Sequence, residues 1–168
     1  MIDALITSRT RIKLLTRLFL NPSLVGHLRG LAEEFDESTN AIRQELNRFE
    51  DAGLLIGETQ GNKKVFHANT FHPLFSAIQG LLRSHHGIDV IIENVIKRLG
   101  NVEKVCAVGA LAEGKDDGTI ELILVGRDID ADYLGSLIAK VESILKRKIE
   151  FTVATTYYNE KSLLLWEI

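Results

Sequence analysis

Apolar residues in the first third of the chain recur at helical spacing in three separate stretches. The first stretch follows Thr7 or Ser8, residues that favour the N-cap of a helix. The second covers about Leu28 to Phe35. The third begins after Ser38 and stops at Gly53, because glycine is typical of the position that follows a helix. The pattern therefore predicts three consecutive helices.

The third predicted helix has an unusual outward face. Its inward positions are apolar, whereas its outward positions carry amide, hydroxyl and guanidinium groups. Glu45 is expected to be the only acid on this face in the first two turns. The outward polar residues are Thr39, Asn40, Arg43, Gln44 and Asn47. Side chains of these types can hydrogen-bond to base edges in duplex DNA.

The pattern after this helix predicts a hairpin and then two further helices. The strands Leu54 to Thr59 and Lys63 to Ala68 flank the polar turn Gln60-Gly61-Asn62. Helical spacing returns over Phe71 to Ser84 and again over Ile88 to Leu99, where the apolar surface exceeds what one neighbour covers. We expect a homodimer in which this surface meets a second copy of the chain. The alternative is that the last helix packs on the sheet of a second domain.

Residues 1 to 70 resemble the winged helix-turn-helix of ArsR-like transcriptional regulators. The resemblance depends on the order of LAEEF, a three-residue turn, STNAIRQELNRFEDAGLL and the basic hairpin segment GNKK. It implies double-stranded DNA as the partner, with the third helix in the major groove and the hairpin on the flanking backbone. By position, the implied DNA-binding residues are Thr39, Asn40, Arg43, Gln44, Asn47, Lys63 and Lys64.

From residue 101 onward, strands and a helix alternate, which predicts an α/β layer. The strands are Val102 to Gly109, Thr119 to Val125 and Lys148 to Thr155, with a helix over Ala131 to Lys146. The segment after the first strand resembles the minimal nucleotidyltransferase domain. In that family, a Gly-Ser-x-Ala-x-Gly motif precedes a strand with two aspartates, and a later strand supplies a third carboxylate that helps to hold Mg²⁺.

The chain departs from this motif at the residues that would hold the metal. The matching positions are Gly109, Ala110, Gly114, Thr119, Glu121 and Glu150. Two glutamates remain where three acids are expected, and Mg²⁺ requires several oxygen ligands in near-octahedral order. We therefore expect no enzyme activity, no cofactor, and a domain kept for dimerisation or for an unidentified ligand or protein partner. The alternatives are an active nucleotidyltransferase with a winged-helix targeting domain, and a winged helix that binds protein.

Metal sensing, the familiar activity of one branch of the ArsR-like family, requires clustered cysteine or histidine ligands. The single cysteine, Cys106, lies in an apolar run that predicts a buried strand. His67 and His72 are scattered, and His85-His86 adjoin at a predicted helix end, where adjacent residues do not share a face. We expect no metal site.

Charge and composition narrow the picture further. The net charge is -3, and residues 1 to 70 contain nine Lys or Arg and nine Asp or Glu, so the surplus acid lies in the second part. One cysteine cannot form an internal disulfide, the N-terminus shows no apolar signal segment, and no apolar run approaches about 20 residues. We expect a cytoplasmic protein without membrane contact. The predicted fold class is α+β: a winged helix over 1–70, a helical connector over 71–87 and a nucleotidyltransferase-like α/β domain over 88–168.

Overall fold

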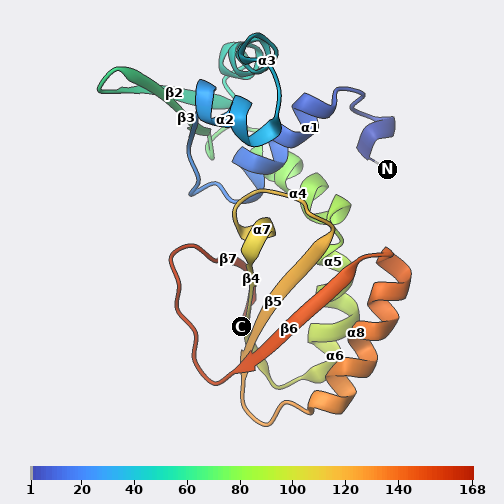
Figure 1. The fold of residues 1–168 in the computed structure, drawn as a ribbon. Helices are drawn as coiled ribbons and strands as arrows, with labels where there is room; N and C mark the ends of the chain where they lie inside the picture. The colour runs from blue at the N-terminus through green and yellow to red at the C-terminus, as the bar shows by residue number, and fades with distance from the viewer. Residues whose placement is uncertain (1) are drawn as a thin grey trace. The chain divides into compact units, whose positions relative to one another are not determined.

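The computed structural model describes residues 2–168 as a mixed α+β protein with two separate β-sheets (Figure 1). The chain divides into two compact units between His85 and His86, and each unit has its own sheet and core. Within residues 2–168, no helix is both long enough and apolar enough to cross a membrane.

Two helices of the first unit begin at caps that the sequence predicts. The Ser8 hydroxyl accepts the N–H of Arg11, and the Ser38 hydroxyl accepts the N–H of Ala41. The first helix continues as a π-helical segment before the chain turns. The elements are η1 (Ile2–Ala4), α1 (Arg9–Leu15), η2 (Thr16–Leu20), α2 (Leu28–Phe35) and α3 (Thr39–Asp51). The three helices expected from apolar spacing are confirmed.

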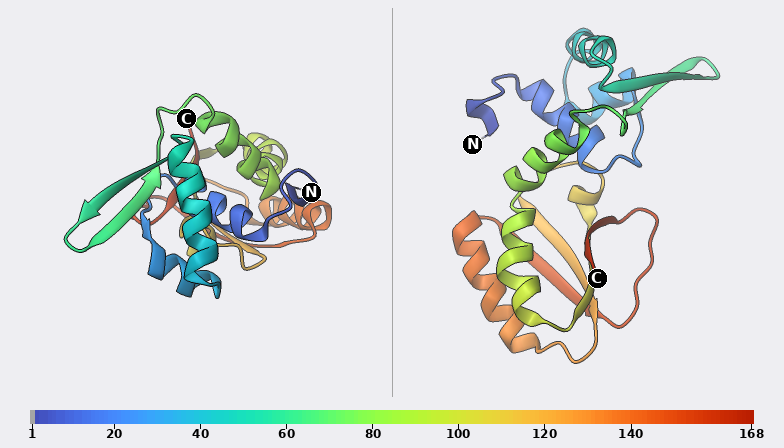
Figure 2. Two further views of the ribbon diagram at one scale, coloured as in Figure 1. Left: turned by 90° about the horizontal axis from the view of Figure 1, so that it is seen from above. Right: turned by 180° about the vertical axis from the view of Figure 1, so that it is seen from behind.

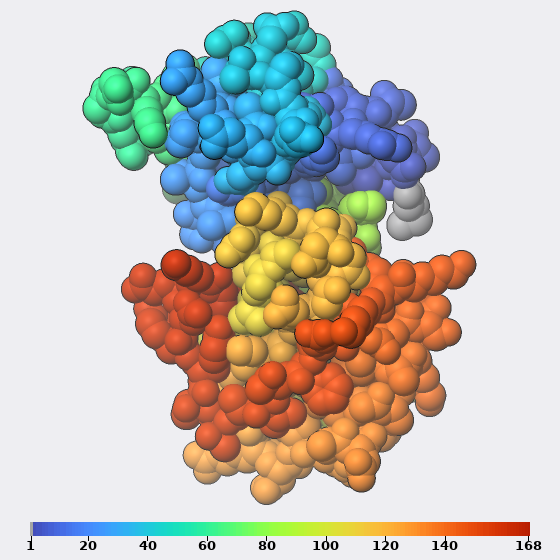
Figure 3. All heavy atoms as spheres, viewed as in Figure 1, coloured from blue at the N-terminus to red at the C-terminus, as the bar shows by residue number. Residues whose placement is uncertain are grey.

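A small antiparallel sheet follows, in the order β1-β3-β2. Its strands are β1 (Gly26–His27), β2 (Leu55–Gln60) and β3 (Lys63–Ala68). Gln60 pairs with Lys63, so the turn contains only Gly61 and Asn62, and the predicted three-residue turn is one residue too long. The φ of Gly61 is +62°, which suits the glycine in a tight turn. The β2–β3 hairpin protrudes from the first unit (Figure 3).

Three phenylalanines join the helices of the first unit. The ring of Phe19 in η2 lies 6.5 Å from that of Phe49 in α3 and 6.1 Å from that of Phe75, measured between centroids. Phe75 begins α4 (Phe75–His85). In the same helix, the side-chain amide of Gln79 donates a hydrogen bond to the backbone carbonyl of Phe19. Phe19 of η2 therefore links α4 to α3 in the core.

The predicted start of α4 at Phe71 is wrong by four residues. The side-chain Oδ1 of Asn69 accepts the N–H of Phe71, and the His72 Nδ1 accepts the N–H of Leu74. These local hydrogen bonds hold residues 71–74 in turns, because Asn and His side chains compete with the helical bonding pattern.

The second unit is a four-stranded sheet with helices on one face. The strand order is β6-β5-β4-β7; β5 and β6 are parallel, and the other neighbours are antiparallel. Two helical segments lie side by side against the sheet (Figure 2, right). The elements are α5 (Ile88–Ile91), η3 (Ile92–Ile96), α6 (Lys97–Leu99), β4 (Val102–Val108), α7 (Gly109–Ala112), β5 (Thr119–Gly126), α8 (Ala131–Leu145), β6 (Lys148–Ala154) and β7 (Leu163–Glu167).

The apolar helix over residues 88–99 is covered inside the second unit. Ile88, Ile91 and Val95 are fully buried, and η3 contacts α8. This agrees with the alternative in which the helix packs on the sheet of its own domain. Between Leu74 and Leu99, the large apolar side chains that are exposed are those of Leu74 and Leu81.

Candidate functional site

The exposed face of α3 carries the polar residues that the sequence singles out. Their positions repeat at helical spacing, opposite the buried Ile42, Leu46 and Phe49. All of them are exposed: Thr39, Asn40, Arg43, Gln44 and Asn47. The structure therefore brings together amide, hydroxyl and guanidinium groups on one side of a single helix.

Glu45 does not lie on this face, and its predicted outward position is wrong. It is 9% exposed, because it follows Ile42 by three residues and precedes Phe49 by four, which is the spacing of the inward face. Arg11 of α1 donates from Nε to Glu45 Oε2 at 2.9 Å and from NH2 to Oε1 at 3.1 Å. This pair joins α3 to α1 and leaves no acid among the first two turns of the exposed face.

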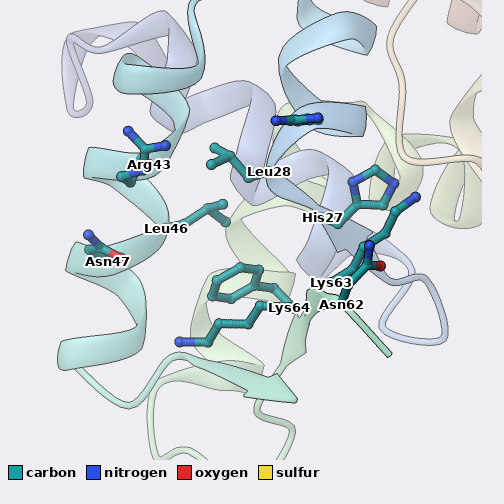
Figure 4. Close-up of a pocket in the computed structure, with 10 residues that line it drawn as sticks. His27, Leu28, Arg43, Leu46, Asn47, Asn62, Lys63 and Lys64 are labelled. Atoms are coloured by element: carbon teal, nitrogen blue, oxygen red, sulfur yellow. The ribbon is translucent and has the colours of Figure 1, made fainter. Parts of the chain in front are cut away.

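A groove of about 470 Å³ lies between α3, the start of α2 and the hairpin (Figure 4). Four of its lining residues are predicted DNA contacts: Arg43, Asn47, Lys63 and Lys64. The others are His27, Leu28, Arg29, Leu46, Asn62 and Phe66. The groove thus combines side chains from segments that are far apart in the sequence.

The charges that line the groove all have one sign. Arg29, Arg43, Lys63 and Lys64 are permanently cationic near neutral pH, and no carboxylate lines the groove. Lys63 has no ion-pair partner in residues 2–168, whereas Lys64 is paired with Glu50. Concave surfaces lined by one sign of charge focus the electrostatic field and attract counterions.

His27 is a groove residue that the sequence analysis missed. Its Nδ1 accepts the N–H of Gly30 at 3.2 Å, which leaves Nε2 as the donor of the neutral ring. A side chain at Gly30 would crowd this ring, since an added Cβ would lie 3.0 Å from Nε2. His27 reaches the groove because β1 pairs with β3, where His27 lies opposite Val65. No local pattern indicates this pairing.

The second predicted site, in the second unit, contains two facing carboxylates. Glu121 of β5 lies opposite Glu150 of β6 in the parallel register, so both side chains share a face of the sheet. Lys148 forms an ion pair with Glu150, which raises the pKa of Lys148. Thr119 lies opposite Lys148 and supplies only a neutral hydroxyl.

The glycine-rich segment of this site lies beside Glu121. Gly109 begins α7 with a φ of +63°, and an added Cβ would lie 2.2 Å from Glu121 Oε1. Ala110 lies within α7, and Gly114 follows it with a φ of +73°. In the described chain, residues 2–168, no group of three or more His, Cys, Asp or Glu could hold a metal ion.

A charged cluster anchors the loop before β5. His86 is buried, and its Nδ1 lies 3.2 Å from Asp116 Oδ2. Arg147 donates from NH2 to Asp116 Oδ1 at 2.5 Å. The pKa of Asp116 is well below its usual value, chiefly because its carboxylate interacts with the His86 side chain. The N–H of Gly118 and the charge of Arg147 lower this pKa further, whereas burial of the carboxylate has the opposite effect. The cluster joins the segment before α5, the loop before β5 and the segment between α8 and β6.

The two predicted sites differ in what they could bind. The groove offers cations and hydrogen-bond donors, which suit a polyanion such as a nucleic-acid backbone. The second site offers two carboxylates, one of them already paired with a lysine, which is fewer than the ligands that Mg²⁺ takes. Comparison with protein-family models, curated proteins and solved structures finds no match for this chain.

Proposed function

We propose that the chain is a DNA-binding transcriptional regulator and that its first unit is a winged helix that binds duplex DNA. The supporting observation is the groove between α3 and the hairpin, which is lined by four cations and no carboxylate. It continues onto the exposed polar face of α3. Phosphate contacts position a protein on DNA, and base-edge contacts give it sequence specificity, so the two surfaces supply the two kinds of contact that a regulator needs.

In this proposal, α3 enters the major groove. Arg43 can bond bidentately to guanine, and Asn47 or Gln44 can do the same with adenine. The width of the major groove admits one α-helix, and an exposed face free of acids in its first turns avoids repulsion from the flanking phosphates. Lys63 and the cations at the start of α2 then contact the backbone.

The second unit serves, in this proposal, as a non-catalytic domain for ligand or partner binding. The supporting observation is the pairing of Glu150 with Lys148, together with the neutral Thr119 where an acid is needed. A homodimer is also proposed, with the exposed apolar residues of the α4 region as the contact. Phe71 and Leu74, in the turns before α4, and Leu81, within α4, are 95%, 55% and 38% exposed. Sedimentation that gives only monomer at micromolar concentration, with and without DNA, would contradict the dimer.

The proposed DNA binding is tested by the affinity of the purified protein for its own upstream DNA at several salt concentrations. Arg43→Ala should weaken specific binding by about 1 to 3 kcal/mol, because it removes a bidentate base contact. Arg98→Ala, an exposed arginine of the second unit, is the matched control and should leave the affinity unchanged. Equal affinities and salt slopes for the wild type and Arg43→Ala would contradict the assignment of this face.

A further inference from the structure

The two hairpin lysines are held differently. Successive strand residues point to opposite faces, and Figure 4 shows Lys64 extending toward α3 while Lys63 extends toward the side of His27. Lys64 Nζ lies 2.7 Å from Glu50 Oε2, in the last turn of α3. The same ammonium lies 5.2 Å from the centroid of the Phe66 ring. One of the four groove cations is therefore already occupied by a carboxylate.

Gly57 of β2 provides the space for this ion pair. An added Cβ at Gly57 would lie 2.4 Å from Lys64 Cε and 2.7 Å from Glu50 Oε1. The backbone conformation of Gly57 does not require glycine, since its φ is not positive. The missing side chain therefore serves to let Lys64 fold back over the hairpin and meet Glu50.

We propose that Glu50 is a built-in competitor of DNA phosphate for Lys64, so that the pair lowers the affinity and the salt dependence of DNA binding. This inference rests on the proposed function. A carboxylate and a phosphate oxygen are both acceptors of charge-assisted hydrogen bonds, so Lys64 binds one at the expense of the other. Loss of the Glu50 charge releases Lys64 for one additional phosphate contact.

The test is DNA binding by Glu50→Gln, measured by fluorescence anisotropy with a mixed-sequence duplex of about 30 base pairs, roughly three helical turns. One additional phosphate contact steepens the slope of log K against log salt by about 0.9. The affinity of Glu50→Gln should therefore exceed that of the wild type at low salt. Between about 50 and 200 mM salt it should fall roughly 3-fold more than the wild-type affinity does.

Asp51→Asn is the matched control. Asp51 is the next residue of α3, is exposed, and has no ion pair in the part of the chain that the structure describes. Its substitution removes the same charge without releasing a lysine, so its salt slope should match the wild type. Equal effects of Glu50→Gln and Asp51→Asn would overturn the inference, because the gain would then be general electrostatics.

Lys64→Ala gives a second, independent measurement. In the wild type it should change the salt slope little, whereas in Glu50→Gln it should abolish the additional slope. Weaker binding by Glu50→Gln would overturn the inference, because Glu50 would then orient Lys64 for DNA. If the wild type binds and Glu50→Gln matches it, only the inference fails. If neither protein binds duplex DNA at any salt concentration, the proposed function fails and the inference fails with it.

Discussion

Replacement of Arg11 by methionine tests how α3 is held against α1. Arg11 makes two charge-assisted hydrogen bonds to Glu45, at 2.9 and 3.1 Å, and the side chains are 30% and 12% exposed. Exposed ion pairs contribute about 0.2 to 1 kcal/mol, whereas loss of one partner from a fully buried pair costs about 3 to 5 kcal/mol. Arg48 NH1, at 3.6 Å from Glu45 Oε1, partly compensates the carboxylate that remains. We therefore expect Arg11→Met to lower the free energy of unfolding by about 2 kcal/mol.

Urea denaturation followed by far-UV circular dichroism measures this loss. The only tryptophan, Trp166, lies in β7 of the second unit, so its fluorescence gives an internal reference that the substitution should not shift. Arg9→Met is the control: Arg9 is an exposed arginine of the same helix, and its loss should change stability by less than about 0.5 kcal/mol.

The double variant Arg11→Met with Glu45→Met separates the ion pair from its surroundings. Apolar side chains of similar size remove the buried charge as well as its partner, so the double variant should regain most of the stability. A loss in Arg11→Met no larger than in Arg9→Met would refute the reasoning, because the pair would then behave as a surface contact. A double variant less stable than Arg11→Met alone would also refute it.

Four further predictions concern the second unit. Gly87→Ala should destabilise it by about 1 to 3 kcal/mol, because the φ of Gly87 is +80° and an added Cβ would lie 2.6 Å from Leu145 Cδ1. Gly135→Ala, where an added Cβ meets nothing within 4 Å inside α8, should stabilise it by about 0.4 to 1 kcal/mol, and tryptophan fluorescence in urea measures both. Asp116→Asn should lower the free energy of unfolding at neutral pH, because the lowered folded-state pKa of Asp116 means that its carboxylate stabilises the fold. This contribution is lost as the carboxylate protonates, so the difference from the wild type should shrink below about pH 4. A difference independent of pH would contradict this. Incubation with labelled nucleoside triphosphates and Mg²⁺ should give no transfer, whereas transfer abolished by Glu121→Gln would establish the enzyme alternative.

Local signals predicted the helices α1, α2 and α3 well. Ser38 and Gly53 delimit α3 because a serine cap and a terminal glycine act through residues only a few positions away. The parallel direction of β5 and β6, the strands that carry Glu121 and Glu150, was also predictable, since a strand, a helix and a strand in succession favour a parallel crossover. In these cases the partners lie close in sequence or follow a general rule of chain topology.

Features that depend on distant partners could not be predicted in this way. The apolar run near the end of the sequence, Leu163–Glu167, is strand β7, which pairs with β4. The run LLLWE lacks the alternation typical of a strand, so only its partner shows its structure. His27 joins the groove through the pairing of β1 with β3, and the inward-facing Glu45 finds its ion-pair partner in Arg11, 34 residues away in the sequence.

The distribution of ion pairs bears on the alternative that the winged helix binds protein. That alternative rests on the zero net charge of residues 1 to 70. Three acids of α2, α3 and the turn between them are paired with cations of α1 and η2: Glu34 with Arg17, Glu37 with Lys13 and Glu45 with Arg11. By contrast, Arg29, Arg43 and Lys63 have no ion-pair partner in residues 2–168, and all three line the groove. Internal pairs cancel in the sum of charges but leave the unpaired cations on one surface. A net charge of zero is therefore compatible with a strongly basic groove, and substitutions on the α1 side should change stability, whereas substitutions in the groove should change binding.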